Sequence, residues 1–387
     1  MADSALQLSA LIPAAGMSTR FEKYKPLLKL GSHTLIEKVI LLFRQCGIED
    51  IIVVTGHNNE MIEPLIIQAG AKAIFNPNFR TGMLSSIQTG VRALSPRSAG
   101  FFLMPADIPL IRPTTIRDLM SSFDDISDDF NTSGKIIIPQ FDGEKGHPPL
   151  IPARLISEIL SLGADSNLGD LISRHKQKKI VQVHDRAILM DADNQSDYER
   201  LQEKYNMIDI PDRQECQSII NASLEGEETI KAHLQLVAET SVRLSEAIAA
   251  AQAKQRQFQN IAIGLDLNLI MAGALLHDIK RKEKNHADKG SQLLLSLGFP
   301  KVADIVARHM DLATPLPAHL TEVQIVYFAD KICNSASLEL DYGRRFKEKM
   351  EKNPEDRGEI LRRYENTQLI QARIEVASGR SISSILS

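Results

Sequence analysis

The sequence predicts two domains of different fold class: an α/β domain over residues 1–205 and an all-α domain over residues 227–387, with a linker at 206–226. Up to about Tyr205, short β-rich runs alternate with amphipathic helical patterns. Beyond Met207 the pattern becomes helical almost throughout. A chain of 387 residues is long enough for two or three domains.

A mainly parallel sheet is expected at the centre of the first domain. The predicted strands are Leu8–Ala14, Asp50–Gly56, Ala71–Asn76, Phe101–Asp107 and Ile136–Gln140. Between the first four strands lie the predicted helices Thr34–Cys46, Asn58–Gly70 and Met83–Leu94. A succession of strand, helix and strand requires right-handed crossovers, which give a buried, Rossmann-like parallel sheet. Ligands of such folds bind at the carboxyl ends of the strands, so the loops that follow strands are the candidate sites.

In the second half we expect helices only, because no strand-like alternation is found there. The predicted helices are Glu227–Ala253, Asn268–Asp278, Asp288–Leu297, Val302–Met310, Glu322–Asp341 and Pro354–Ala377. The last of them is expected to complete the core of this domain.

Composition excludes several classes of function. Aromatic residues make up 5% of the chain and Trp is absent, which argues against a stacking platform for single-stranded nucleic acid. The net charge is −4, with 22 basic and 24 acidic residues up to residue 205 and 23 and 25 after it, so neither half is a basic arm. The most apolar stretch, Ile261–Leu276, is too short to span a bilayer. Three isolated cysteines and no signal-peptide pattern predict a cytoplasmic protein without membrane or nucleic-acid partners.

The loop after the first strand carries the clearest motif of the first half. It reads Pro13-Ala14-Ala15-Gly16-Met17-Ser18-Thr19-Arg20 and is followed by Lys25-Pro26-Leu27-Leu28. Small residues let the backbone approach a ligand, and the N–H groups of such a loop can hold phosphate oxygens. Arg20 and Lys25 add positive charge suited to a polyphosphate.

This order of small residues, Gly, Ser and Arg, followed by Lys-Pro-Leu, resembles nucleotidylyltransferases of the molybdenum cofactor guanylyl/cytidylyltransferase-like family. The likeness extends over roughly residues 8–205. Its further segments are Asn76-Pro77 with Gly82-Met83-Leu84-Ser85-Ser86, then Phe101–Pro109, Gly146-His147-Pro148-Pro149, and Asp191-Ala192-Asp193-Asn194 with Asp197.

The resemblance implies a role for each matching position. Arg20, Lys25 and Asp107 are the expected catalytic residues, Asp107 and Asp193 the expected Mg²⁺ ligands with Asp191 in reserve, and His147 an expected substrate contact. The nucleotide would be bound by Ala14, Ala15, Gly16, Ser18, Arg20, Lys25, Gly82, Ser85 and Ser86. In this chemistry a phosphate oxygen of the acceptor attacks the α-phosphorus of a nucleoside triphosphate and pyrophosphate leaves. The step depends on positioning and charge neutralisation, to which Mg²⁺ is suited.

Within this family Ala-Ala-Gly in the loop is associated with CTP, and Ala-Gly-Gly with GTP. The resemblance therefore implies transfer of CMP to a molybdopterin-type cofactor and delivery of the product to a molybdoenzyme. Other nucleoside triphosphates and other phosphorylated acceptors, such as sugar or alcohol phosphates, remain open. The chain also has Glu22 where the family usually has Gly.

A second motif lies in the helical half, where His277-Asp278 closes an apolar helical run. Two adjacent metal-ligand side chains at the end of a buried helix are unusual unless something binds them. The further ligand types of the motif are His233, His286, His309 and Asp330. This series over residues 227–345 resembles the HD superfamily of metal-dependent phosphohydrolases.

The resemblance implies that His233, His277, Asp278 and Asp330 hold one metal, with His286 and His309 serving a second and Asp278 bridging the two. Imidazole and carboxylate ligands suit Mn²⁺, Fe, Co²⁺, Ni²⁺ or Mg²⁺, so one or two divalent metals of unspecified identity are expected. The basic run Lys280–Lys282 is expected to be a solvated face. The alternative is a regulatory HD domain that binds a nucleotide or metal without hydrolysis.

Overall fold

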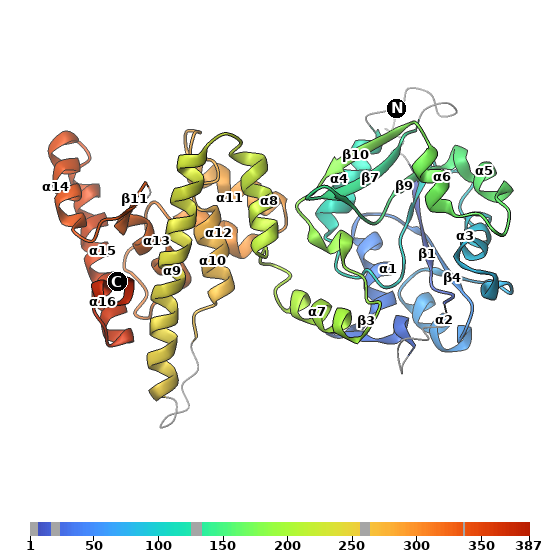
Figure 1. The fold of residues 1–387 in the computed structure, drawn as a ribbon, viewed down its shortest axis with the longest axis horizontal. Coiled ribbons are helices and arrows are strands. Elements are labelled where there is room, and N and C mark those ends of the chain that lie inside the picture. Colours follow the sequence, from blue (N-terminus) through green and yellow to red (C-terminus); the bar gives the residue numbers. More distant parts are fainter. Residues whose placement is uncertain (1–6, 17–23, 125–133, 256–263, 336) are drawn as a thin grey trace. The chain divides into compact units, whose positions relative to one another are not determined.

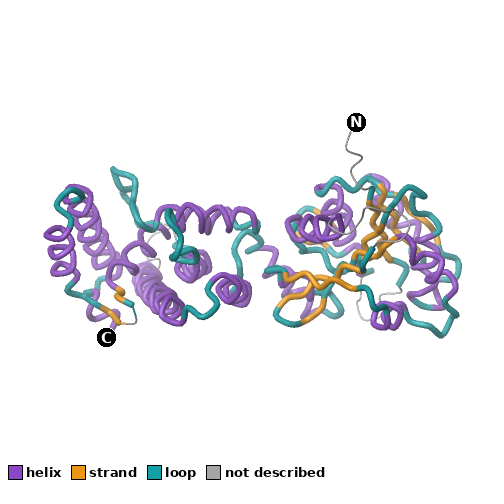
Figure 2. The backbone as a smooth tube through the Cα atoms, turned by 90° about the horizontal axis from the view of Figure 1, so that it is seen from above, coloured by secondary structure: helices purple, strands orange, loops and turns teal. Residues whose placement is uncertain are grey.

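The computed structural model describes residues 7–16, 24–124, 134–255, 264–335 and 337–387. The chain divides into two compact units, Met1–Ile208 and Asp209–Ser387. Figure 1 shows a sheet surrounded by helices in the first unit and helices in the second. Figure 2 shows the same contrast by colour, with all but one small pair of the orange strands in the first unit. The two fold classes predicted from the sequence are thereby confirmed.

The main sheet of the first unit has the strand order β10-β7-β9-β6-β1-β4-β5, with β8 paired to β7. The bounds are β1 (Leu8–Pro13), β4 (Asp50–Thr55), β5 (Lys72–Phe75), β6 (Gly100–Leu103), β7 (Ile136–Phe141), β8 (Glu144–Lys145), β9 (Leu150–Pro152) and β10 (Lys178–Gln182). The central neighbours β6, β1, β4 and β5 pair in parallel. Strand β9 runs antiparallel to both β6 and β7, so the sheet is mainly and not wholly parallel.

Both faces of the sheet are buried. Ala10 and Ile12 of β1 belong to one hydrophobic core, whereas Leu11 between them belongs to the core on the other face. Successive side chains of a strand point to opposite faces, so an uninterrupted apolar strand needs cover on both sides.

The cover comes from helices and short connections. The helices are α1 (Leu35–Gln45), α2 (Asn59–Gln68), α3 (Met83–Val91), α4 (Pro113–Asp124), α5 (Ile156–Ser161), α6 (Leu168–Arg174) and α7 (Gln195–Asn206). The hairpin β2 (Lys29–Leu30) and β3 (His33–Thr34) precedes α1. Helix α1 begins with a capping box between Thr34 and Glu37, which satisfies backbone N–H groups that lack a partner in the helix.

The second unit is a helical bundle with one small hairpin. Its helices are α8 (Arg213–Ser223), α9 (Glu228–Gln255), α10 (Leu267–Leu276), α11 (His286–Ser296), α12 (Pro300–Arg308), α13 (Glu322–Ile332), α14 (Tyr342–Lys352), α15 (Arg357–Ser378) and α16 (Ile382–Leu386). One hydrophobic core draws on α8 through α16. Among the residues that the structure describes, no helix is both long and apolar enough to cross a membrane.

Two segments of the second unit differ from the sequence analysis. The expected linker contains α8, whose Cys216, Ile219 and Ile220 are buried in the core of this unit. The helix expected over Glu322–Asp341 ends at Ile332 and gives way to the hairpin β11 (Cys333–Asn334) and β12 (Ser337–Leu338). Ser335 in its turn has φ +52°, a left-handed conformation that an α-helix does not accommodate.

Candidate functional site

The loop after β1 is fixed by its neighbours at its first residues. Ala14 N–H donates to Val54 O at 2.8 Å, and Tyr24 Oη donates to Ala14 O at 2.8 Å. Ala14 and Ala15 are buried, whereas Gly16 is exposed. The predicted contacts Ser18 and Arg20, together with Glu22, lie outside the described residues. Tyr24, which anchors the loop through a carbonyl, was not singled out by the sequence analysis.

Three predicted site residues meet beyond the end of β6. Lys25 Nζ lies 2.5 Å from Asp107 Oδ2 and 3.0 Å from Asp193 Oδ1. Asp107 is in the turn that follows β6, and Asp193 directly precedes Asn194, the N-cap of α7. Burial acts to lower the pKa of Lys25, but the hydrogen bonds and charges of Asp107 and Asp193 outweigh it and raise this pKa above its ordinary value. The cluster therefore holds a permanent cation between two carboxylates.

Two further titratable groups lie within the electrostatic reach of this cluster. Burial and the charges of Asp193 and Asp107 raise the pKa of Asp191. Burial lowers the pKa of His147 despite the opposing charge of Asp107, so its imidazole is neutral at neutral pH. Asp197, the last residue of the family-like segment that starts at Asp191, forms a capping box with Asn194 and so stabilises the start of α7.

The expected nucleotide contacts at α3 fall into two groups. Gly82 has φ +111° and open space around the position of a Cβ atom, and it is the N-cap of α3. Ser85 and Ser86 are both bonded within the protein, since Asn76 Nδ2 donates to Ser85 Oγ at 2.9 Å and to Ser86 Oγ at 3.1 Å. Ser86 is only 3% exposed, so its hydroxyl serves the local fold, whereas Ser85 lies closer to the surface.

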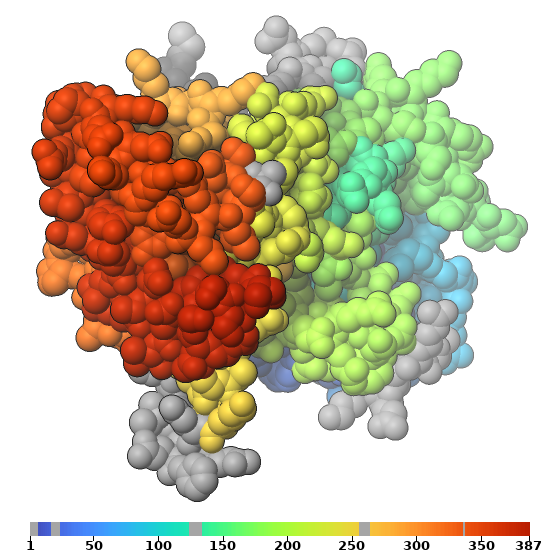
Figure 3. Space-filling view, turned by 60° about the vertical axis from the view of Figure 1, so that its left-hand side comes forward, coloured from blue at the N-terminus to red at the C-terminus, as the bar shows by residue number. Residues whose placement is uncertain are grey.

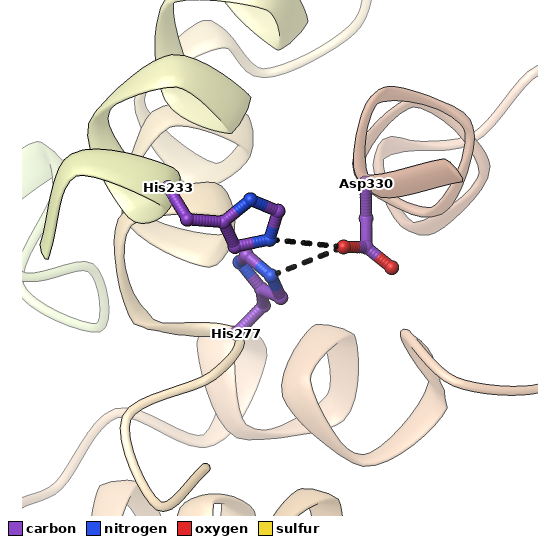
Figure 4. Close-up of side chains that lie close together, drawn as sticks. All are labelled: His233, His277 and Asp330. Atoms are coloured by element: carbon purple, nitrogen blue, oxygen red, sulfur yellow. Dashed lines mark hydrogen bonds and ion pairs between the residues drawn. The ribbon is translucent and has the colours of Figure 1, made fainter. Parts of the chain in front are cut away.

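In the second unit the structure brings all six predicted ligand residues together, in two groups of three. One group is His233, His277 and Asp330, and the other is Asp278, His286 and His309; within each, ligand atoms lie within 4.8 Å of one another. His233 Nε2 is 3.2 Å and His277 Nε2 3.5 Å from the same oxygen, Asp330 Oδ1, as Figure 4 shows.

Asp278 connects the two groups. Its Oδ1 lies 3.1 Å from His286 Nε2 and 3.3 Å from His309 Nε2, while its Oδ2 lies 3.6 Å from His277 Nε2. One carboxylate thus faces both groups with different oxygens. This is the geometry of a bridging ligand.

Helix ends position the two central histidines. His277 is the C-cap of α10 and His309 the C-cap of α12. Each ring nitrogen Nδ1 donates to the carbonyl three residues earlier, His277 to Ala274 O at 2.8 Å and His309 to Val306 O at 2.7 Å. A carbonyl can only accept, so Nδ1 carries a proton and Nε2 is the ring nitrogen that faces the site.

The two carboxylates of this site, Asp278 and Asp330, have pKa values well below the ordinary range. Burial opposes ionisation of Asp278, but the nearby imidazoles of His286 and His309 and the charge of His277 keep its pKa far below the ordinary value. Burial likewise opposes ionisation of Asp330, while the charge of Lys331, the hydrogen bond with His233 and the nearby His277 hold its pKa low. Burial lowers the pKa of His277, but Asp330 and Asp278 outweigh it and raise that pKa.

The donor set fits a metal centre. The Nε2 atoms of His277, His286 and His309 are buried and have no hydrogen-bond partner among the described residues. Leaving buried polar atoms unsatisfied is costly, and metal coordination is one way to satisfy an imidazole lone pair. Mixed imidazole and carboxylate donors suit several first-row transition metals as well as Mg²⁺.

Comparison with known proteins finds a family match in each half of the chain. Residues 10–179 match the MobA-like NTP transferase domain and residues 230–335 match the HD domain. The chain is 26% identical over 205 residues to "Molybdenum cofactor cytidylyltransferase" of Escherichia coli, covering 52% of this chain and 98% of that protein. It is 32% identical over 111 residues to "3-deoxy-manno-octulosonate cytidylyltransferase" of Rickettsia canadensis, covering 28% and 44% respectively. The crystal structure of Rv0371c from Mycobacterium tuberculosis aligns with TM-score 0.44 and 23% identity over 52% of this chain and all of that one.

The protein joins a MobA-like NTP transferase domain to an HD domain. The NTP transferase domain makes it a nucleotidyltransferase. Lys25, Asp107 and His147 lie inside the matched transferase residues, whereas Asp193 follows them. All six ligand residues of the second unit lie inside the matched HD domain.

A cavity of about 360 Å³ lies beside the candidate metal ligands of the HD domain, with His233, Asp278 and Asp330 in its wall. Arg281 is exposed, as expected for a solvated face, and it also lines the cavity and bonds Asp278 Oδ2 at 3.1 Å. The neighbours Lys280 and Lys282 pair instead with Glu283 and Glu227. The sequence analysis missed the other cations of this wall, which are Lys331, Arg345, Lys349 and Arg363. Only Lys331 had a signal in the sequence, its place directly after Asp330.

Proposed function

We propose that the NTP transferase domain transfers CMP from CTP to a phosphorylated acceptor of the molybdopterin type and releases pyrophosphate. The observation that carries this proposal is the Lys25 ammonium held between Asp107 and Asp193 after β6, at the sheet edge where ligands of such folds bind. The likeness to a molybdenum cofactor cytidylyltransferase over nearly its whole length supports the choice of acceptor. The product would then pass to a molybdoenzyme.

In this proposal each residue acts by position and charge. The backbone of Ala14 to Gly16 approaches the phosphates, as its anchoring by Tyr24 and Val54 favours. Lys25 binds phosphate oxygens, and Asp107 and Asp193 offer the hard oxygen donors that Mg²⁺ prefers. The acceptor phosphate oxygen bonds to the α-phosphorus while the bond to the β-phosphate oxygen breaks. Mg²⁺, when bound, would neutralise the charge that builds on the leaving pyrophosphate.

The test is pyrophosphate release from CTP, GTP, ATP and UTP, each with Mg²⁺ and a molybdopterin-type acceptor. The proposal expects release that requires the acceptor and is fastest with CTP. Equally fast release with a sugar phosphate would contradict the proposed molybdopterin-type acceptor. Faster release from another nucleotide would contradict CTP as the substrate.

We further propose that the HD domain is a metal-dependent phosphohydrolase. The supporting observation is Asp278, whose two oxygens face two separate groups of ligands. Two divalent ions held there would lower the pKa of a shared water and neutralise a phosphate. Arg281 and Lys331, beside Asp278 and Asp330, supply further positive charge. In the reaction water oxygen bonds to phosphorus, the ester bond breaks and the leaving oxygen takes a proton.

Metal analysis of the purified chain combined with hydrolysis of phosphomonoesters and phosphodiesters tests this second proposal. The expected result is one or two divalent ions per chain and hydrolysis that a chelator abolishes. A chain that carries metal and is inert towards every phosphoester would instead support the regulatory alternative.

A further inference from the structure

The cavity beside the HD ligands is walled by residues from two different parts of the chain. One wall comes from the matched HD residues, which end at 335. The rest of the lining, which we call the C-terminal wall, comes from helices beyond that match, with Arg345, Phe346 and Lys349 on α14 and Ile360 and Arg363 on α15. In Figure 3 this C-terminal segment, orange to red, forms a continuous block at the surface of the second unit.

Five cations line this one cavity: Arg281, Lys331, Arg345, Lys349 and Arg363. Three of them have tasks inside the protein. Arg281 pairs with Asp278 and Lys331 with Asp330, at 3.1 and 2.6 Å. Arg345 bonds the carbonyls of Lys331 and Cys333 and lies 3.6 Å from Glu339, and so fixes the start of the small hairpin.

The two cations of the C-terminal wall that remain have unused donors. Within the described part of the chain, no hydrogen bond or ion pair engages the ammonium of Lys349, which is exposed to solvent. Arg363 Nη2 pairs with Glu359 and lies 4.0 Å from Asp311 Oδ2, but its buried Nε has no partner among the described residues. Donors of like charge around a cavity repel one another, and an anion between them would relieve that repulsion.

One phosphate group does not account for all these charges. A phosphate at the ligand groups would already meet the metals, Arg281 and Lys331. Lys349 and Arg363 add two further cations to the same cavity from the C-terminal wall, which also contributes the apolar Phe346 and Ile360. A volume of about 360 Å³ lies at the lower end of the range for small-molecule sites, about 300–1,000 Å³.

We propose that α14 and α15 form a recognition wall that selects phosphoesters with a second phosphate-like anion, which Lys349 and Arg363 bind. The substrate class is therefore a small organic molecule with two phosphate groups, one at the ligand groups and one at this wall. This inference rests on the proposed hydrolase function of the HD domain. Lys349 and Arg363 are positioning and specificity residues in it and do not touch the ester bond that breaks.

The experiment uses the full chain loaded with Mn²⁺ and two probes, methylenediphosphonate with two anionic groups and methylphosphonate with one. Isothermal titration measures the affinity of wild type, Lys349→Gln and the matched control Lys347→Gln, which lies on the same helix but outside the cavity wall. Losing one charge-assisted hydrogen bond should weaken methylenediphosphonate binding about tenfold in Lys349→Gln, with methylphosphonate binding unchanged. Lys347→Gln should match wild type for both probes.

Binding of either probe to the transferase domain is the same in all three proteins and cancels in the comparison. Arg363→Gln provides a second variant with the same expected loss. Equal affinities of Lys349→Gln and Lys347→Gln, or an equal loss for both probes, would overturn the recognition wall. Metal content of the same samples separates the two proposals: absence of metal refutes the hydrolase, whereas metal without a Lys349→Gln effect refutes the wall alone.

Discussion

Replacement of Asp278 by Asn is the sharpest perturbation of the proposed HD metal centre. The substitution keeps the shape of the side chain but removes the charge that faces His277, His286 and His309. Asp278 is buried and its pKa is held far below the ordinary value, so it is an anion throughout the neutral range. The amide that replaces this carboxylate would offer one neutral oxygen in place of two charged ones.

The loss in metal affinity can be estimated from other sites. Structural zinc sites bind with about 10–16 kcal/mol shared among four ligands, or about 3 kcal/mol per ligand, which is roughly a hundredfold in Kd. Metal present at a thousand times its Kd stabilises the folded state by about 4 kcal/mol. For a unit of this size, 1 kcal/mol shifts Tm by about 2–4 °C. The variant should therefore lose most of a metal-induced Tm increase of about 8–16 °C.

The assay is thermal unfolding of the full chain with and without added Mn²⁺, together with metal content after dialysis. Asp288→Asn is the matched control, because Asp288 is an exposed carboxylate on α11 outside both ligand groups. A metal-induced shift of equal size in wild type and Asp278→Asn would refute the assignment of Asp278 as a ligand. A shift lost equally in Asp288→Asn would show that the effect is not specific to the site.

Three further predictions concern other groups. Asp107→Ala should reduce kcat/KM for transfer, measured by steady-state kinetics, at least about a thousandfold. It should lower the free energy of unfolding, measured by thermal unfolding, by at most about 1 kcal/mol, because the ion pair of Asp107 with Lys25 is partly exposed. Because Asp330 and Asp278 raise the pKa of His277, a proton competes with metal for this imidazole up to a higher pH than at an ordinary histidine. Metal affinity should therefore rise with pH and binding should release a proton, as titrations in buffers of different ionisation enthalpy would show; a pH-independent affinity would contradict the assignment. Asp185→Asn should lower the free energy of unfolding by about 3–5 kcal/mol in denaturant titrations, because it breaks the buried ion pair with Arg112. The control Asp165→Asn, at an exposed position, should have the same free energy of unfolding as wild type.

Local patterns were sufficient to predict most elements of the fold. The run Ile136–Gln140 became β7 with one residue more, and the predicted helices of the second half lie close to their expected bounds except Glu322–Asp341, which ends at Ile332. Strand order and the antiparallel direction of β9 were not predictable, because they depend on contacts between distant segments. The α8 helix was missed because the proline and charged residues around it were interpreted as a linker, although its apolar face packs into the second core.

The candidate sites were predictable where the ligands belong to short motifs. His277-Asp278 and the histidines around it could be named from the sequence, and the structure brings them together. The wall formed by Lys349 and Arg363 could not, because those residues lie on helices without a motif and reach the cavity only through tertiary packing. Ser86 shows the opposite case, a motif position whose hydroxyl is buried against Asn76.

The central claim is that this chain carries two independent sites of phosphoryl chemistry. It is tested most directly by measuring two activities in wild type, Asp107→Ala and Asp278→Asn: CTP-dependent pyrophosphate release with a molybdopterin-type acceptor, and Mn²⁺-dependent hydrolysis of bis(p-nitrophenyl) phosphate and p-nitrophenyl phosphate. We predict that Asp107→Ala loses only the transfer and Asp278→Asn only the hydrolysis. Loss of both activities in either variant, or loss of neither in both, would contradict the claim.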